Sequence, residues 1–421
     1  MTTTRIDSAH ERRITIALFA AGLTTFASMY SAQALLPSLS AAFGATPARA
    51  ALAVSLTTGF LALAIIPVSA LSSRIGRTKV MVGSAVTAAV IGLLLPLSPS
   101  LEALLAGRAM QGIALAGVPA VAMAYLAEEI GEEGLGAAMG IYVAGTTIGG
   151  LAGRLIPAFT LDLASWRWAQ AVASLAAAAC TVWFVRWLPP SRGFVARPAG
   201  MRTVVGDLGS QVRHRGLLAL FGLAFVLMGG FVSMYNYLGY RLTSAPFRLP
   251  EALAGLVFVL YLAGTAASAA SGRLTDRIGR SWVLAMSLAV MAVGLVVTIP
   301  DHLGTVIVGV LLFTAGFFGA HTAASAWVGA MAEGNRGAAS SLYLFAYYLG
   351  SALIGGTAGI VYASSGWLGL VGGIGLLMVI AALLLAVSRR EALTSAASTH
   401  RARRARPLPP WTYAARSGRA R

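Results

Sequence analysis

The sequence predicts an all-α polytopic membrane protein whose twelve transmembrane helices form two six-helix repeats. Of its 421 residues, 57% are hydrophobic and only 11% are charged, against roughly 25% charged residues in an average soluble domain. Apolar runs recur along the chain, and each is long enough to cross a hydrocarbon layer of about 30 Å. The runs are too long and too continuous for the strands of a transmembrane barrel.

The apolar runs and the basic loops between them predict the topology. We expect the spans at roughly 14–36, 50–71, 80–98, 103–127, 135–158, 167–188, 217–240, 252–271, 282–300, 304–330, 338–362 and 366–387. An even number of spans places both termini on one side, where the loops and termini carry 25 Lys and Arg, or 16 without the nine arginines of the tail. The other side carries five, at Arg49, Arg154, Arg167, Arg241 and Arg248. Because positively charged loops stay in the cytoplasm, both termini are expected there, with the protein in the inner (plasma) membrane.

The longest loop divides the chain into two bundles. Residues 189–216 form this basic cytoplasmic linker between bundles at 14–188 and 217–387. Residues 1–13 precede the first span. The Arg-, Ala- and Pro-rich tail at 388–421 follows the last span and is expected to be disordered.

The remaining composition excludes several classes of function. The net charge of +17 could suggest nucleic acid, but the charge lies in the tail and beside spans, so we expect no nucleic-acid partner. The acidic loop at 128–133 is expected to be solvated, with attraction to Arg336 or the tail as the alternative. The sequence has no phosphate-binding loop, no Cys/His metal spacing and no nucleophile elbow. We therefore expect no enzyme activity, no cofactor and no metal. The run at 14–36 is too long for a signal-peptide core, so it is taken as the first span.

Three short motifs recur in the same order in the second half. Residues 26–30 recur at 231–235, residues 74–77 at 277–280 and residues 136–142 at 337–343, with offsets of 205, 203 and 201. Six spans per unit give both copies the same orientation. Parallel repeats about an axis along the membrane normal place a site between the halves, near the midplane.

The loop after span 8 runs from Gly272 to Arg280 and reads GRLTDRIGR. In this tight turn Asp276 can pair with Arg277 or Arg280. Such a charge cluster can form when one face of the protein closes and break when that face opens. The alternative is that the arginines only hold the loop in the cytoplasm.

This loop resembles the signature loop of the major facilitator superfamily, Gly-x-Leu-Ala-Asp-Arg-x-Gly-Arg. The family carries one copy after span 2 and a weaker copy after span 8. The copy after span 2 here keeps Arg74, Gly76 and Arg77 but has Ser69 for the glycine and Ser73 for the aspartate. The acidic member of the family's N-terminal charge latch is therefore missing.

Arg108 lies about five residues into span 4. A central arginine costs about 2.5–3.5 kcal/mol on insertion scales, so it normally has a reason to be there. The alternative is that its side chain snorkels to the nearby surface. The run Leu104-x-x-x-Arg108-x-x-Gln111-Gly112 resembles the superfamily's span-4 motif, whose arginine is implicated in proton coupling, and this resemblance favours a functional role.

Span 5 carries a ladder of small residues at Gly145, Gly149 and Gly153, which allows another helix to approach closely. The run from Gly145 to Gly150 also resembles the superfamily's export-associated Gly-Pro-x-x-Gly-Gly motif, with Thr146 in place of proline. The resemblance favours export over import.

Polar side chains at span depth predict an uncharged, aromatic cavity. His321 in span 10 titrates near neutral pH, although it could also stay neutral and donate to a helix carbonyl. Tyr30 and Tyr235 are favoured because the repeat relates them. The other candidates are Gln33, Tyr125, Tyr142, Asn236, Tyr343 and Tyr347. No Asp or Glu is placed clearly inside a span, so His321 and Arg108 remain the candidates for proton coupling.

The resemblance covers about residues 14–387 and implies a secondary transporter working by alternating access and driven by a proton gradient. Its partners would be a small-molecule substrate, protons and the lipid bilayer, with the protein acting as a monomer. An aromatic, weakly charged cavity favours export of a drug-like or hydrophobic molecule. Import of a sugar or small organic ion is the alternative. A non-transporting sensor or a membrane enzyme would need a signalling domain or a reactive cluster, and the sequence shows neither.

Overall fold

The computed structural model describes residues 8–194, 196, 201–332 and 335–405, and these are almost entirely helical. The first half contains α1 (Ser8–Tyr30), α2 (Leu36–Phe43), α3 (Pro47–Ile75), α4 (Arg77–Leu94), η1 (Leu95–Leu97), α5 (Leu101–Leu115), α6 (Gly117–Glu129), α7 (Glu132–Leu161) and α8 (Trp166–Trp187). The second half contains α9 (Met201–Val212), α10 (Arg215–Thr243), α11 (Glu251–Gly255), η2 (Leu256–Leu260), α12 (Tyr261–Ile278), α13 (Arg280–Val297), α14 (Leu303–Met331) and α15 (Arg336–Ala405).

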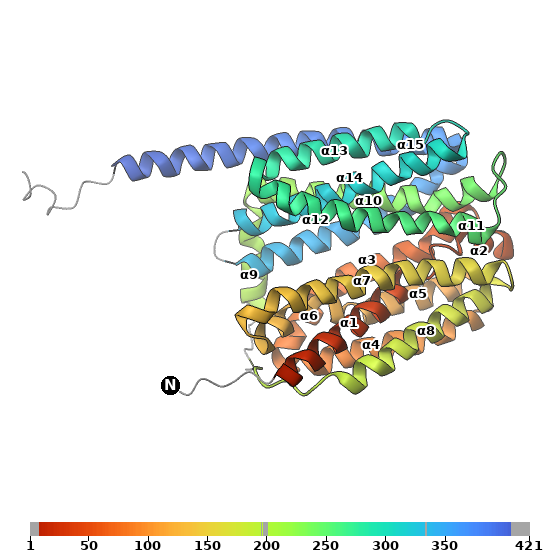
Figure 1. Ribbon diagram of the computed structural model, residues 1–421, viewed down its shortest axis with the longest axis horizontal. Helices are drawn as coiled ribbons and strands as arrows, with labels where there is room; N and C mark the ends of the chain where they lie inside the picture. Colours follow the sequence, from red (N-terminus) through yellow and green to blue (C-terminus); the bar gives the residue numbers. More distant parts are fainter. Residues whose placement is uncertain (1–7, 195, 197–200, 333–334, 406–421) are drawn as a thin grey trace, which may run out of the picture.

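The predicted number of spans is confirmed. Within the described ranges, eleven helices are long and apolar enough to cross a membrane, and the last of them is 57 residues long. That helix is interrupted at Gly366, whose φ of 61° and ψ of −154° are not helical. The chain reverses direction there (Figure 1), so α15 supplies spans 11 and 12.

Several predicted edges shift for local reasons. Span 1 ends at Tyr30, and residues 31–35 form turns before α2. Span 4 is divided into α5 and α6 near Ala116, three residues before Pro119, which has no N–H to give to the helix. Beyond the predicted end of span 12, α15 continues as a helix to Ala405, and the rest of the predicted disordered tail, 406–421, lies outside the described residues.

The helices form two bundles joined through α9. The first bundle holds α1 to α8 and the second holds α10 to α15 (Figure 1). The bundles meet mainly where α3 packs along α15 and where α7 packs against α11 and η2. We call the end of the molecule near α9 the Arg77 end, and the opposite end, near α2 and α11, the Gln33 end (Figure 1).

Glycines are required at two kinds of position. Gly76 and Gly279 occupy equivalent places in the two RIGR loops, residues 74–77 and 277–280. Their φ values are 109° and 86°, which residues with a Cβ rarely adopt. In the ladder of α7, a Cβ on Gly149 or Gly153 would lie 2.7 Å from the Cα of Leu23 or Ala27 in α1. The missing side chains therefore allow α1 and α7 to pack backbone against backbone.

Candidate functional site

The two bundles are in direct polar contact at the Gln33 end. The side-chain amide of Gln33 donates to Asn236 Oδ1 at 2.8 Å, and both residues are buried. Nearby, the hydroxyl groups of Ser40 and Tyr240 lie 2.7 Å apart, and Tyr240 also donates to the Leu36 carbonyl at 2.8 Å. These contacts join the α1–α2 segment to α10, so the molecule is closed at this end.

Arg154 of α7 lies next to this closure. Its Nε donates to Gln33 Oε1 at 2.6 Å, one Nη donates to the Gly150 carbonyl at 2.6 Å, and the other donates to the Tyr261 hydroxyl at 3.2 Å. The guanidinium also lies over the rings of Tyr30 and Tyr261, 3.9 Å and 4.4 Å from their centroids. Our assignment of Arg154 to an outer loop is wrong, because the side chain is 2% exposed and contacts both bundles.

The sequence already indicated that Arg154 lies within a span. Arg154 falls inside the predicted span 135–158 and directly follows Gly153 of the glycine ladder. A charge within a predicted span is a candidate for function. Its position near the end of that span favoured a loop position instead.

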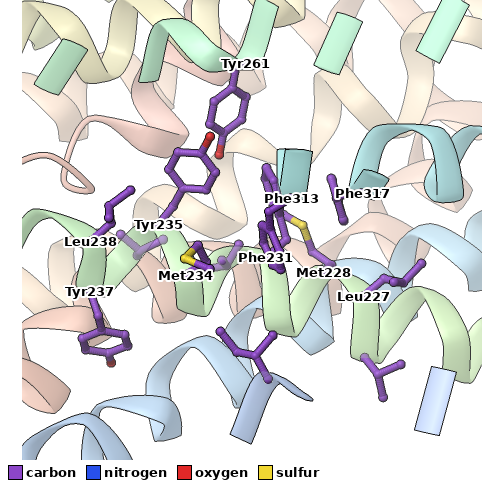
Figure 2. Packing of buried hydrophobic residues seen from close by; sticks show 14 of the residues in the cluster. Leu227, Met228, Phe231, Met234, Tyr235, Tyr237, Leu238, Tyr261, Phe313 and Phe317 are labelled. Carbon is purple, nitrogen blue, oxygen red and sulfur yellow. The ribbon is translucent and has the colours of Figure 1, made fainter. Parts of the chain in front are cut away.

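A continuous aromatic cluster extends from Arg154 into the second bundle. Phe231 stacks on Phe317 with ring centroids 3.8 Å apart, and Tyr235 lies against Tyr261 at 4.8 Å. Figure 2 shows the hydroxyl ends of Tyr235 and Tyr261 next to one another, and the ring of Phe231, further along α10, stacked against that of Phe313 from α14. The Tyr235 hydroxyl is 2.7 Å from that of Thr314. The cluster is a buried apolar layer with a few fixed hydroxyl groups.

His321 follows Phe317 on α14, four residues further along the helix. Its Nδ1 is 3.0 Å from the Tyr343 hydroxyl, and its ring centroid is 4.8 Å from that of Tyr347. His321 and Tyr347 are half-buried, whereas Tyr343 is buried. The structure thus brings these three candidates together on α14 and α15.

A cavity of about 1030 Å³ opens between the bundles at the Arg77 end. Its walls come from both bundles and from α9, and they include Ile65, Ser69, Ser73, Arg77, Met123, Asp207, Arg336, Ser340 and Leu344. The molecule is thus closed at the Gln33 end and hollow between the bundles at the Arg77 end.

Charge contacts at the Arg77 end differ between the two repeats. Arg77 pairs with Glu128 at 2.9 Å and donates to the Ser72 hydroxyl at 2.6 Å. In the other repeat Asp276, Arg277 and Arg280 are exposed, and no ion pair of theirs is present in the described part of the chain. Gly272 and Arg74 lie in the same two loops. The predicted Asp276 cluster is therefore not formed while this end is open.

The acidic loop is not simply solvated. Besides the Arg77–Glu128 pair, the carboxylate of Glu129 is 1% exposed. It accepts hydrogen bonds from the backbone N–H groups of Arg192 and Gly193 at 2.9 and 2.8 Å. The expectation of a solvated loop is wrong for Glu129, whereas Glu128 is exposed. The two glutamates connect α6 to the start of α4 and to the start of the linker.

Arg108 is fully buried, which excludes the snorkelling alternative. Its Nε donates to the Ala53 carbonyl at 2.9 Å, and its two Nη atoms donate to the carbonyls of Ser28 and Met29 at 2.9 and 2.7 Å. Gln111 Oε1 accepts a further bond at 2.6 Å. These acceptors are all neutral and all lie in the first bundle, so Arg108 ties α1 and α3 to α5.

None of the nine predicted cavity residues is among those that line the cavity at the Arg77 end, and two of them lie in the core of the first bundle. Tyr125 and Tyr142 are buried in the core of the first bundle, in a cluster with Ile14 and Leu18. The Tyr125 hydroxyl donates to the Pro189 carbonyl at 3.4 Å. Neither residue lines the cavity between the bundles.

The fold and the paired bundles define a class of protein, the secondary transporters built from two six-helix repeats. A family model for the Major Facilitator Superfamily matches residues 18–249 and 240–420. The chain is 43% identical to the inner membrane transport protein YnfM of Escherichia coli (strain K12) over 374 residues, which cover 88% of this chain and 89% of that protein. It is 39% identical to the MFS-type transporter YybF of Bacillus subtilis (strain 168) over 370 residues, 88% of this chain and 92% of that protein.

Solved structures show the same fold. The nucleoside transporter NupG superposes with a TM-score of 0.74 at 12% identity, over 90% of this chain and 99% of that one. A D-xylose-proton symporter gives 0.71 at 16% identity, over 89% and 97%. The chain belongs to the Major Facilitator Superfamily, and it is a multi-pass membrane transporter rather than an enzyme.

Proposed function

We propose that this transporter exports a drug-like or hydrophobic small molecule in exchange for protons. The observation that carries the proposal is the aromatic cluster that extends from the closed Gln33 end to the His321–Tyr343 pair on α14 and α15. Aromatic and apolar walls with a few placed polar groups favour amphiphilic organic ligands. Export also agrees with a weaker relative, the chloramphenicol resistance protein CraA of Acinetobacter baumannii, 24% identical over 230 residues, 54% of this chain and 55% of that protein.

In this mechanism His321 carries the proton. It hydrogen-bonds to Tyr343 between two helices of the second bundle, and imidazole changes charge in the physiological pH range. Of the carboxylates in the described ranges, only Asp207 lines the large cavity, at its wall on α9. Moving one charge through 100 mV supplies about 2.3 kcal/mol, enough for almost fiftyfold accumulation.

The topology follows from the loop charges. We propose that the Arg77 end faces the cytoplasm, with both termini on that side, and that the protein works as a monomer. The Arg77-end loops are rich in arginine, and with the buried Arg154 and Arg241 set aside only Arg49, Arg167 and Arg248 remain at the opposite end. The cavity at the Arg77 end would then receive substrate from the cytoplasm.

The test uses the full chain in proteoliposomes with chloramphenicol as the probe. An imposed pH gradient should drive its accumulation, and His321→Gln should abolish the gradient-driven part while leaving downhill exchange. The matched control is His302→Gln, because His302 is exposed at the other end of the same helix. Full gradient-driven accumulation by His321→Gln would remove His321 from the mechanism. Accumulation under the opposite gradient direction would favour import, the alternative that the sequence left open.

A further inference from the structure

Arg154 is a buried cation without an anionic partner. No carboxylate of the described residues lies within ion-pair distance of its guanidinium. Its hydrogen-bond acceptors are an amide, a carbonyl and a hydroxyl group, and the rings of Tyr30, Phe258 and Tyr261 surround it. An unpaired charge in such surroundings is costly and normally has a functional reason.

Among the described residues two other arginines are buried, and both have simpler explanations. Arg241 pairs with Asp301 at 3.0 Å and caps the carbonyls at the end of α13. Arg108 is enclosed within the first bundle by backbone carbonyls and Gln111. Arg154 differs from both because its contacts are divided between two bundles that must move apart.

Separation of the bundles at the Gln33 end would break the contacts of Arg154 with the second bundle and keep those within the first. Gln33, Gly150 and Tyr30 belong to the same bundle as Arg154 and would stay with it. Tyr261 and Phe258 belong to the other bundle and would leave. The departure frees one Nη of the guanidinium and one face of the site, with the Tyr30 ring still against the other face.

We propose that Arg154 and its aromatic cage recognise the anionic group of the transported molecule, which is an aromatic carboxylate. A guanidinium has the planar donor geometry that matches a carboxylate. The Tyr30 and Tyr261 rings would hold an aromatic body by stacking or edge contacts. This inference rests on the proposed transport function and names the substrate class for the same pathway.

The test measures ligand binding by the purified full-length protein. The probes are benzoate, salicylate and 1-naphthoate, each compared with its neutral amide, and the readouts are thermal stabilisation and the half-saturating concentration. We expect the carboxylates to bind at least about tenfold more tightly than the amides in the unaltered protein. Arg154→Gln should remove this preference, and Arg154→Lys should keep part of it.

Arg49→Gln is the matched control. It removes a positive charge from an exposed ion pair with Glu102, outside the cage, and should leave carboxylate binding unchanged. If Arg154→Gln does not fold, the comparison of acids with amides in the unaltered protein still tests the proposed preference for carboxylates. Equal binding of acids and amides, no binding of any acid, or unchanged acid binding by a folded Arg154→Gln overturns the proposal.

Failure of this inference differs from failure of the transport proposal. If Arg154→Gln still exports chloramphenicol under a pH gradient and acids bind no better than amides, the transport function stands and the anion site is wrong. If acids bind in an Arg154-dependent manner but no pH gradient drives chloramphenicol or the acids, the site stands and the proposed proton-coupled export is wrong.

Discussion

Removal of the hydrogen bond from Arg154 to Tyr261 tests how the Gln33 end is held shut. Tyr261→Phe removes only the acceptor, because the phenyl ring can keep the contact that now places the guanidinium 4.4 Å from the ring centroid. The bond crosses from α7 to α12 at 3.2 Å. It can form only while the two bundles are together, so its whole contribution favours the closed arrangement.

The magnitude follows from the geometry. Hydrogen bonds that involve a charged group contribute about 1.5–3 kcal/mol, and the length of 3.2 Å favours the lower value. Since 1.4 kcal/mol is a factor of ten, Tyr261→Phe should raise the ratio of open to closed molecules at this end by about tenfold. The Gln33–Asn236 bond remains, so the population changes while the fold does not.

Cysteine labelling measures this population. After Cys180→Ser, a cysteine at Ala34, which is 9% exposed at the closed end, should react about tenfold faster with an impermeant maleimide in the Tyr261→Phe background. Tyr237→Phe is the control, because the Tyr237 hydroxyl donates to the Gly355 carbonyl within one bundle. Equal labelling rates in the unaltered, Tyr261→Phe and Tyr237→Phe backgrounds would refute the gate.

Four further outcomes are expected. Gly149→Ala should lower the free energy of unfolding by about 1–3 kcal/mol, because its Cβ meets the backbone of α1, whereas Gly140→Ala, with open space around it, should not destabilise the protein in the same denaturant titration. Arg108→Met should cost about 3 kcal/mol or more, since it removes three hydrogen bonds from a charged donor to buried carbonyls, and an unchanged melting temperature would contradict this. Asp276→Asn should favour the state open at the Arg77 end, because the lost charge cluster belongs to the closed state, and unchanged labelling on both faces would reduce the loop to a topology determinant. A chain that ends at Arg390 should insert and transport like the full chain, and loss of membrane insertion would assign a role to the tail.

The sequence was sufficient for the features that depend on local pattern. The twelve apolar runs and the RIGR repeat predicted the two bundles, because span length and loop glycines are set by the bilayer and by backbone conformation. The glycine ladder of α7 predicted a close helix contact, and the structure places it against α1. These signals are local, so one sequence is enough to detect them.

The features that depend on side-chain depth and helix rotation were harder to predict. Tyr125 and Tyr142 lie in spans 4 and 5 but point into the first bundle rather than the cavity. The contact of Arg154 with Tyr261 could not be predicted, because the two residues lie 107 positions apart in the sequence. Hydropathy gives the length of a span but not which of its faces meets the other repeat.

The positions of the buried arginines indicate how the molecule divides into moving parts. Arg108 joins α1, α3 and α5 through backbone carbonyls, and the glycine ladder joins α1 to α7, so the first bundle is held together by contacts that rocking need not break. Across the Gln33 end, by contrast, the described contacts include the Gln33–Asn236 bond and the Arg154–Tyr261 bond. Neither joins two opposite charges, and an isolated bond of this kind contributes only a few kcal/mol at most. A substrate anion that replaces the Tyr261 hydroxyl as the partner of Arg154 would offset the loss of that bond when the end opens. The cation that helps to close the pathway would thus also allow the substrate to select between its two states.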